Sequence, residues 1–329
     1  MHKYLFLFIF LISSLASANA AIVDAAFVAE ATQRGAIVWD VRAASNYEKG
    51  HIPGAVNIGA AGVVLRNPNT EDFLPIAQLE KLLGAGGIDP AREIIVYSTR
   101  ADTIAYFGLY TLLYFGGKRA YVYHDGIDGW RADGRALSTE PRKLAPVALK
   151  LVPSANISVT TDQFIAASRR SGVQIIDART VSEFTGNDIR AIRGGHVPGA
   201  INIPYEQNWV DPETTQKLAR KQVADNAGMS LKPAEELKRL YAQLDPAKET
   251  IVYCQSGVRA AETATVLAQL GFQNVKVYDS SWLGYAARLS APVVNETFFN
   301  VGALNNRLTA MQQRIEQLER ELAAAKSAK

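Results

Sequence analysis

The chain contains the same segment twice, and this repetition constrains its fold more than any other feature. The segment AIVWDVR at 36–42 leads into HIPGAVNI at 51–58, and VQIIDAR at 173–179 leads into HVPGAINI at 196–203. Each copy continues through an apolar run, a polar loop, a helical pattern and a further strand-like run. A repeated unit of this size in a chain of 329 residues predicts two similar domains rather than one large one.

Short β-rich runs alternate with helical stretches within each copy. The apolar runs 94–97 and 251–253 each lead through a polar loop into a helical pattern. Such alternation is typical of parallel strands covered by helices, so we expect an α/β fold with one parallel sheet in each of two domains. Ligands of such sheets bind at the carboxyl ends of the strands. Chemistry is therefore expected in the loops that begin at Ser98 and Cys254.

The chain divides into four predicted parts. Residues 1–20 combine a lysine, an apolar run and a small-residue Ala-Asn-Ala pattern, which predicts a secretory signal and export. We expect a first domain at 21–145, a second at 146–296 and a C-terminal coiled-coil helix at 297–329. No later run is apolar and long enough for a membrane span, so no membrane attachment is expected after removal of the signal.

The predicted C-terminal helix carries a heptad pattern. Apolar residues recur at alternating steps of three and four over 301–322, the spacing of a coiled-coil seam. Arg314 and Glu319, like Glu321 and Lys326, occupy g and following e positions, which suits a parallel partner. The alternative is a helix packed on its own domain, but the seam is narrow for that and an isolated helix is marginal in water. We therefore expect a homo-oligomer, either a dimer or a trimer.

Charge and the supply of metal ligands argue against two classes of function. The formal net charge is +3 and the basic residues are spread along the chain, so we expect no nucleic-acid binding. Four histidines and one cysteine are too few soft ligands for a structural zinc site. We expect neither a metal nor a cofactor.

The sole cysteine, Cys254, stands in the loop CQSGVR at 254–259, between a buried strand and a helix. Backbone N–H groups and the helix N-terminus favour an anion there, and Gly257 permits a tight turn. The alternative is a small buried hydrophobe, as most unpaired cysteines are. The position at a strand-to-helix junction favours a reactive thiolate, and a single cysteine cannot close an internal disulfide.

Together these motifs resemble the signature set of the rhodanese family. The set comprises DAR at 177–179 with Glu183 and Phe184, HVPGAINI at 196–203, the loop at 254–259 and YDSSW at 278–282. The tandem arrangement resembles thiosulfate and 3-mercaptopyruvate sulfurtransferases, in which an inactive first domain supports a catalytic second one. The resemblance implies that Cys254 takes the outer sulfur of a small anionic donor, holds it as a persulfide and passes it to cyanide or a thiol. It also makes the periplasm the expected location.

The resemblance assigns further site residues. It implies that backbone N–H groups of the loop stabilise the persulfide and that the side chain of Arg259 attracts the donor. The loop residues concerned are Gln255, Ser256, Gly257, Val258 and Arg259. A salt bridge that shapes the loop is the alternative role for Arg259. Arg190 and Arg193 lie in an insertion where mercaptopyruvate-type enzymes place substrate-binding arginines; solvated surface side chains are the alternative.

The first domain departs from the pattern where chemistry requires it. Ser98 stands at the cysteine position and Thr103 at the arginine position. A serine hydroxyl needs an activating base, and none is evident in this loop, so we expect the first domain to be inactive. Because the histidine and the Asp-x-Arg pair persist in this inactive copy, the matching His196, Asp177 and Arg179 are predicted to be fold determinants rather than catalytic groups.

Three alternatives to a thiosulfate-using enzyme follow from the same loop. Mercaptopyruvate-type relatives usually follow the cysteine with Gly-Ser-Gly-Val-Thr, whereas a cationic Arg259 suits a doubly charged inorganic donor, so we favour thiosulfate over 3-mercaptopyruvate. Phosphatases of this fold place five residues between cysteine and arginine, and here there are four, which disfavours a phosphatase. A non-enzymatic sulfane-sulfur carrier or binding module is the third alternative.

Overall fold

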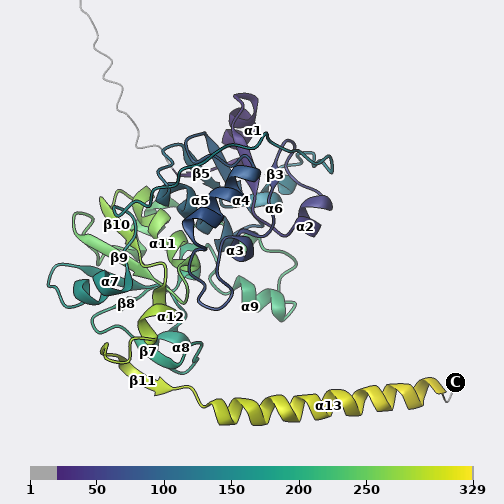
Figure 1. The fold of residues 1–329 in the computed structure, drawn as a ribbon, viewed down its shortest axis with the longest axis vertical. Helices are drawn as coiled ribbons and strands as arrows, with labels where there is room; N and C mark the ends of the chain where they lie inside the picture. Colours follow the sequence, from purple (N-terminus) through teal and green to yellow (C-terminus); the bar gives the residue numbers. More distant parts are fainter. Residues whose placement is uncertain (1–20, 328–329) are drawn as a thin grey trace, which may run out of the picture.

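The structure is a computed structural model that describes residues 21–327. Two α/β halves follow each other along the chain, the first purple to blue and the second teal to green in Figure 1. A long helix then projects from the second half. The predicted secretory signal at 1–20 lies outside the described residues. The expected fold class, two domains with helix-covered parallel sheets and a long C-terminal helix, is confirmed.

The first sheet has five strands in the order β1-β5-β4-β2-β3, and every pairing is parallel. Its central strands are buried at every position because helices cover both faces, as their unbroken apolar sequences predict. The strands are β1 (Ile22–Val23), β2 (Ile37–Asp40), β3 (Val56–Asn57), β4 (Ile94–Tyr97) and β5 (Ala120–Tyr123). The helices are α1 (Ala25–Gln33), α2 (Ala44–Glu48), α3 (Ala61–Val64), α4 (Ile76–Ala85), α5 (Thr103–Tyr114) and α6 (Gly126–Ala132).

The second sheet has four parallel strands in the order β10-β9-β6-β8. Asp177 pairs with Tyr253 here as Asp40 pairs with Tyr97 in the first sheet, so the repeated sequence folds in the same register twice. The strands are β6 (Gln174–Asp177), β8 (Ile201–Asn202), β9 (Glu249–Tyr253) and β10 (Asn274–Val277). The helices are α7 (Thr161–Ala167), α8 (Val181–Phe184), η1 (Tyr205–Asn208), α9 (Thr214–Ala219), η2 (Ala227–Met229), α10 (Ala234–Leu240), α11 (Val258–Gln269) and α12 (Ser281–Ala286).

The insertion in the second half forms an antiparallel ribbon, which the expected parallel sheets did not include. Strand β7 (Arg193–His196) pairs with β11 (Val294–Phe298), interrupted by an irregularity in register. Strand β11 therefore extends beyond the boundary predicted at 296. The last helix, α13 (Val301–Ser327), begins three residues after this strand ends.

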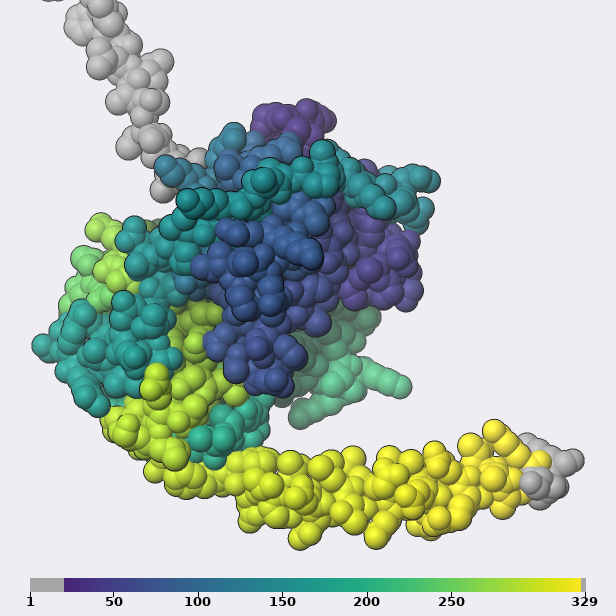
Figure 2. Space-filling view, in the orientation of Figure 1, coloured from purple at the N-terminus to yellow at the C-terminus, as the bar shows by residue number. Residues whose placement is uncertain are grey.

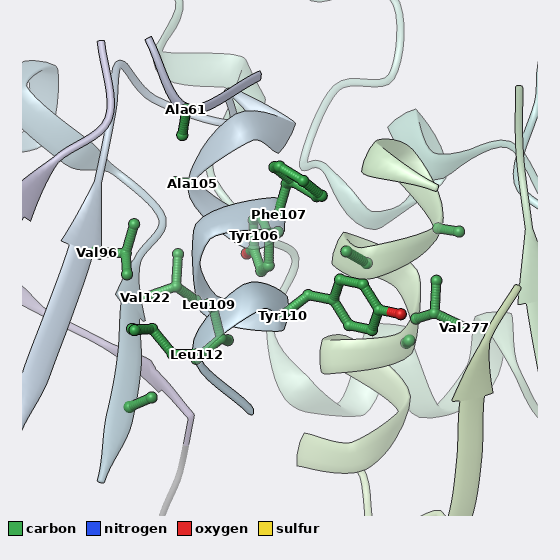
Figure 3. Close-up of a cluster of buried hydrophobic side chains, with 14 of the residues drawn as sticks. Ala61, Val96, Ala105, Tyr106, Phe107, Leu109, Tyr110, Leu112, Val122 and Val277 are labelled. Atoms are coloured by element: carbon green, nitrogen blue, oxygen red, sulfur yellow. The ribbon is translucent and has the colours of Figure 1, made fainter. Parts of the chain in front are cut away.

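The two halves share one buried apolar cluster. Helix α5 is buried over eight consecutive residues, because its own sheet covers one side and α11 covers the other. In Figure 3, Leu109 and Leu112 lie beside Val96 and Val122 of the first sheet, while Tyr110 extends towards the second half. A fully buried side chain of this size contributes about 1.5–3 kcal/mol to stability. The shared core therefore holds the first half firmly against α11, the helix that opens at the cysteine loop.

Helix α13 stands apart from both halves. Every residue from 301 to 326 is exposed, and Figure 2 shows the helix as a yellow rod that extends away from the body. The predicted apolar seam runs along this rod, unburied by the described residues. Between residues 21 and 327, no helix combines the length and apolar character that crossing a membrane requires.

Candidate active site

Cys254 lies at the carboxyl end of β9, and the turn after it requires a glycine. Gly257 has a φ of +82°, and a Cβ at this position would lie 2.4 Å from Oδ1 of Asp279. A side chain here would be both conformationally strained and in collision with Asp279. The loop can therefore curl tightly between β9 and α11 only with glycine at this position. Cys254 itself is 1% exposed.

The hydroxyl of Ser281 holds the underside of the cysteine loop. It accepts hydrogen bonds from the N–H groups of Cys254 and Gly257, both at 3.0 Å, and donates one to the carbonyl of Tyr278 at 2.7 Å. The Gly257 N–H is thus used within the fold, and this differs from the prediction that it faces the persulfide. For the other four loop N–H groups, no hydrogen-bond acceptor exists among residues 21–327. They belong to Gln255, Ser256, Val258 and Arg259.

Arg259 forms a two-point salt bridge with Glu183 of α8. Its Nη1 and Nη2 donate to the two carboxylate oxygens at 2.7 and 2.8 Å. Burial opposes ionisation of Glu183, but the hydrogen bonds and charge of Arg259 outweigh it and lower the pKa of Glu183 to about 2. Burial likewise disfavours the guanidinium, yet Glu183 and the neighbouring Cys254 raise the pKa of Arg259. The loop-shaping salt bridge, predicted as the alternative role of Arg259, is present in the structure.

The two arginines of the insertion lie in different surroundings. Arg190 is 52% exposed at its side chain and reaches Glu183 at 3.2 Å, so it joins the same cluster as Arg259. Arg193 is 2% exposed and donates to Glu296 at 2.6 Å and to the carbonyls of Ala286 and Arg288 at 3.0 and 2.7 Å. Of the two arginines, Arg190 is therefore the one that a small anion near the cysteine loop could reach.

Gln255 connects the insertion to the cysteine loop. Its Nε2 donates to the carbonyl of Arg190 at 2.7 Å. Its Oε1 is buried and has no hydrogen-bond partner among residues 21–327. Buried polar atoms are usually paired, so this unpaired oxygen is an exception among the buried polar atoms of the fold.

The residues predicted to be fold determinants are buried in structural contacts. Arg179 binds Asp177 through Nε at 2.9 Å and Nη2 at 2.6 Å, and Asp177 is fully buried. His196 stacks on Phe184 at 3.5 Å and bonds that residue's carbonyl through Nδ1. The same Asp–Arg geometry recurs at Asp40 in the first half. These contacts agree with a structural role for all three residues.

The first half carries a modified copy of the loop. The hydroxyl of Ser98 donates to Asp102, whose other oxygen caps helix α5 through the N–H of Ile104. Asp102 is therefore a group near Ser98 that could accept its proton, contrary to the expectation that this loop contains no base. A carboxylate on its own is still too weak a base to activate an alcohol for this chemistry. Across residues 21–327, no cluster of three or more His, Cys, Asp or Glu side chains is arranged to hold a metal ion.

The chain is a tandem α/β protein whose second half carries its single thiol in a strand-to-helix loop, and comparisons with known proteins match both halves. Residues 24–133 and 160–288 each match the rhodanese-like domain. The thiosulfate sulfurtransferase of Corynebacterium glutamicum is 34% identical over 267 residues, covering 75% of this chain and 80% of that protein. A Mycobacterium tuberculosis protein provisionally assigned the same activity is 32% identical over 261 residues, covering 76% and 87%. The chain belongs to the rhodanese family, which confirms the predicted resemblance.

A solved structure has the same fold at lower sequence identity. The anaerobic ergothioneine biosynthesis enzyme from Chlorobium limicola, in complex with its substrate trimethyl histidine, superposes with a TM-score of 0.70. The identity is 20%, and the match covers 83% of this chain and 70% of that one. This likeness extends over both halves and concerns the fold alone.

Proposed function

We propose that the protein is a sulfurtransferase that moves sulfane sulfur from thiosulfate through a persulfide on Cys254. The observation that carries the proposal is the loop around the only cysteine, where four backbone N–H groups lack an acceptor among residues 21–327. Such groups stabilise an anion held at the centre of the loop. The relatives named as thiosulfate sulfurtransferases support the same activity.

The proposed reaction has two steps. The Cys254 thiolate attacks the outer sulfur of thiosulfate, the S–S bond of the donor breaks, and sulfite leaves with the bonding electron pair. Cyanide or a thiolate then attacks the outer sulfur of the persulfide, which yields thiocyanate or a new persulfide and restores the thiolate. Atoms and electrons balance in both steps without a cofactor.

Charge near the loop supports an anionic donor. Arg259 and Arg190 share the single carboxylate of Glu183, so these three side chains together carry one net positive charge. Because Glu183 engages both Nη atoms of Arg259, the half-exposed Arg190 is the cation better placed to meet a donor. Such a site favours doubly charged thiosulfate over singly charged 3-mercaptopyruvate, which is the alternative donor.

The first prediction concerns donor choice. We expect the mature protein to transfer sulfur to cyanide with a kcat/KM for thiosulfate at least about tenfold above that for 3-mercaptopyruvate, the effect of one charge-assisted hydrogen bond of about 1.5 kcal/mol. Steady-state formation of thiocyanate from each donor measures this ratio. A preference for 3-mercaptopyruvate would contradict the donor assignment, and a stable persulfide without rapid turnover would favour a sulfane-sulfur carrier.

We also propose that the protein is exported to the periplasm and forms a homo-oligomer through α13. The signal-like pattern at 1–20 supports export. Seven apolar residues of the heptad seam, between 38% and 62% exposed, support self-association. They are Val301, Leu304, Leu308, Met311, Ile315, Leu318 and Leu322. Burying each would contribute about 1 kcal/mol. Two of the four a positions, Val301 and Ile315, are β-branched and are followed by leucine at d, a combination that favours a parallel dimer over a trimer.

The second prediction tests this assembly. Ile315→Asp places a charge in the middle of the seam and is expected to convert the dimer to a monomer, with unchanged sulfur transfer per chain. Sedimentation equilibrium of the full mature chain measures the mass. Gln313→Asp adds the same charge on the opposite face of α13 and is expected to remain dimeric. A monomeric unmodified chain at tens of micromolar would overturn the proposal.

A further inference from the structure

We infer that Arg66, in the first domain, is a positioning residue for the sulfur-transfer loop of the second domain. This inference rests on the proposed function. Arg66 follows α3 and is 3% exposed at its side chain. Its Nη1 donates to the carbonyl of Ser256 at 2.5 Å, and its Nη2 donates to Oδ1 of Asp279 at 2.7 Å. A residue of the catalytically silent domain thus contacts the backbone of the cysteine loop.

The first contact sets the orientation of one peptide plane. The carbonyl of Ser256 and the N–H of Gly257 belong to the same planar peptide and point in opposite directions. Arg66 donates a hydrogen bond to the carbonyl on one side of this peptide, and the hydroxyl of Ser281 accepts a hydrogen bond from the N–H on the other side. Since that hydroxyl also accepts the N–H of Cys254, rotation of this plane would disturb the start of the loop as well.

The second contact is with Asp279, the residue that packs against Gly257. Asp279 is buried and lies so close to Gly257 that no Cβ would fit between them. Burial raises the pKa of Asp279 and Arg66 opposes that rise, with a resulting pKa of about 6. Without Arg66 this carboxyl would lose its only salt-bridge partner among residues 21–327 and become harder to ionise.

The surroundings of Arg66 hold its guanidinium in place. Its Cζ lies 4.3 Å from the ring centre of Phe107, on the α5 helix that packs against α11. An isolated antiparallel β-bridge between Arg66 and Phe73 closes the loop that carries Arg66. Asp72 of that loop accepts a hydrogen bond from Ser280 at 2.6 Å. The first domain therefore presents Arg66 to the cysteine loop from a rigid support. This gives the inactive copy a role in catalysis.

Arg66→Met is the variant that tests this role, because it keeps an unbranched, flexible apolar stem and removes the guanidinium together with both hydrogen bonds. We expect kcat for thiosulfate-to-cyanide transfer to fall roughly 10- to 100-fold, as misplacement of a reacting group does, with a smaller change in KM. We also expect the pH profile of Cys254 alkylation by iodoacetamide to move to higher pH, since a rotated Ser256–Gly257 peptide would change how the loop N–H groups face the thiolate. Arg66→Lys, which restores the charge beside Asp279, should recover part of both properties.

Arg100→Met is the matched control. Arg100 also reaches from the first domain to the second, through Asn226 at 3.2 Å, but none of its hydrogen bonds involves the cysteine loop. We expect it to lower the melting temperature without changing kcat or the alkylation profile. Should Arg66→Met fail to fold, Arg66→Lys gives the readout, with a partial loss of kcat and a partial shift of the profile.

The outcomes separate this inference from the proposed function. Wild-type kcat and an unchanged alkylation profile in a folded Arg66→Met protein would overturn the positioning role. Absence of transfer by the unmodified protein from either donor would overturn the proposed function instead, and the alkylation profile would still test whether Arg66 orders the loop.

Discussion

Replacement of Cys254 with serine is expected to reduce sulfur transfer from thiosulfate to cyanide by at least about 10³-fold, to the uncatalysed background. Both proposed steps form or break a bond to the sulfur of this residue, and the chain has no second cysteine. A hydroxyl in the same place is neither ionised nor able to accept sulfur at neutral pH. Steady-state formation of thiocyanate measures the loss.

The serine variant should remain folded, because serine has nearly the shape of cysteine and keeps the N–H that donates to Ser281. Equal melting temperatures for the two proteins provide the control. Intact mass spectrometry after incubation with thiosulfate should show a gain of one sulfur atom on the unmodified protein and none on Cys254→Ser. Turnover retained by the serine variant would show that another group carries the sulfur.

The largest expected effect on stability follows from Asp177→Ala. Asp177 is the only carboxylate bonded to the guanidinium of Arg179 among residues 21–327, and both side chains are at most 1% exposed. Removal of one partner leaves a buried charge unpaired, which typically costs 3–5 kcal/mol, so we expect a loss of about 3–5 kcal/mol in the free energy of unfolding. Denaturant titration monitored by tryptophan fluorescence measures it, since Trp282 lies 4.3 Å from the guanidinium.

Two further variants define this effect. Asp40→Ala removes the equivalent carboxylate from the first domain and should destabilise the protein to a similar extent. Asp162→Ala removes an exposed carboxylate from the second domain, with a side chain that is 81% accessible, and should change stability by less than about 1 kcal/mol. An Asp177→Ala protein as stable as Asp162→Ala would contradict the structural role of the Asp–Arg pair.

Much of the fold could be predicted from local patterns. The repeated AIVWDVR and VQIIDAR segments specify strands β2 and β6, because apolar runs of this length between turn residues suit the buried centre of a parallel sheet. The location of Cys254 at a strand end follows from the strand that precedes it. The heptad spacing likewise predicted the long helix that became α13.

The pairing of arginines could not be predicted in the same way. Arg190 and Arg193 are three residues apart and equally basic, yet Arg190 is half exposed near the cysteine loop and Arg193 is buried against the end of α12 and β11. The antiparallel pairing of β7 with β11 decides this difference, and it joins segments about a hundred residues apart. Sequence spacing alone carries no information about such a pairing.

By itself, the sequence determined the two-domain plan, the serine that replaces cysteine in the first copy and the single cysteine at a strand end. Each of these depends on neighbouring residues, whose relative positions the backbone geometry of a strand or helix sets. Only the tertiary structure decided that Glu183 engages Arg259 and that Arg66 supports the cysteine loop. Arg66 and Ser256 are 190 positions apart, and packing of α5 on α11 brings them within hydrogen-bond distance because the two domains share one apolar core.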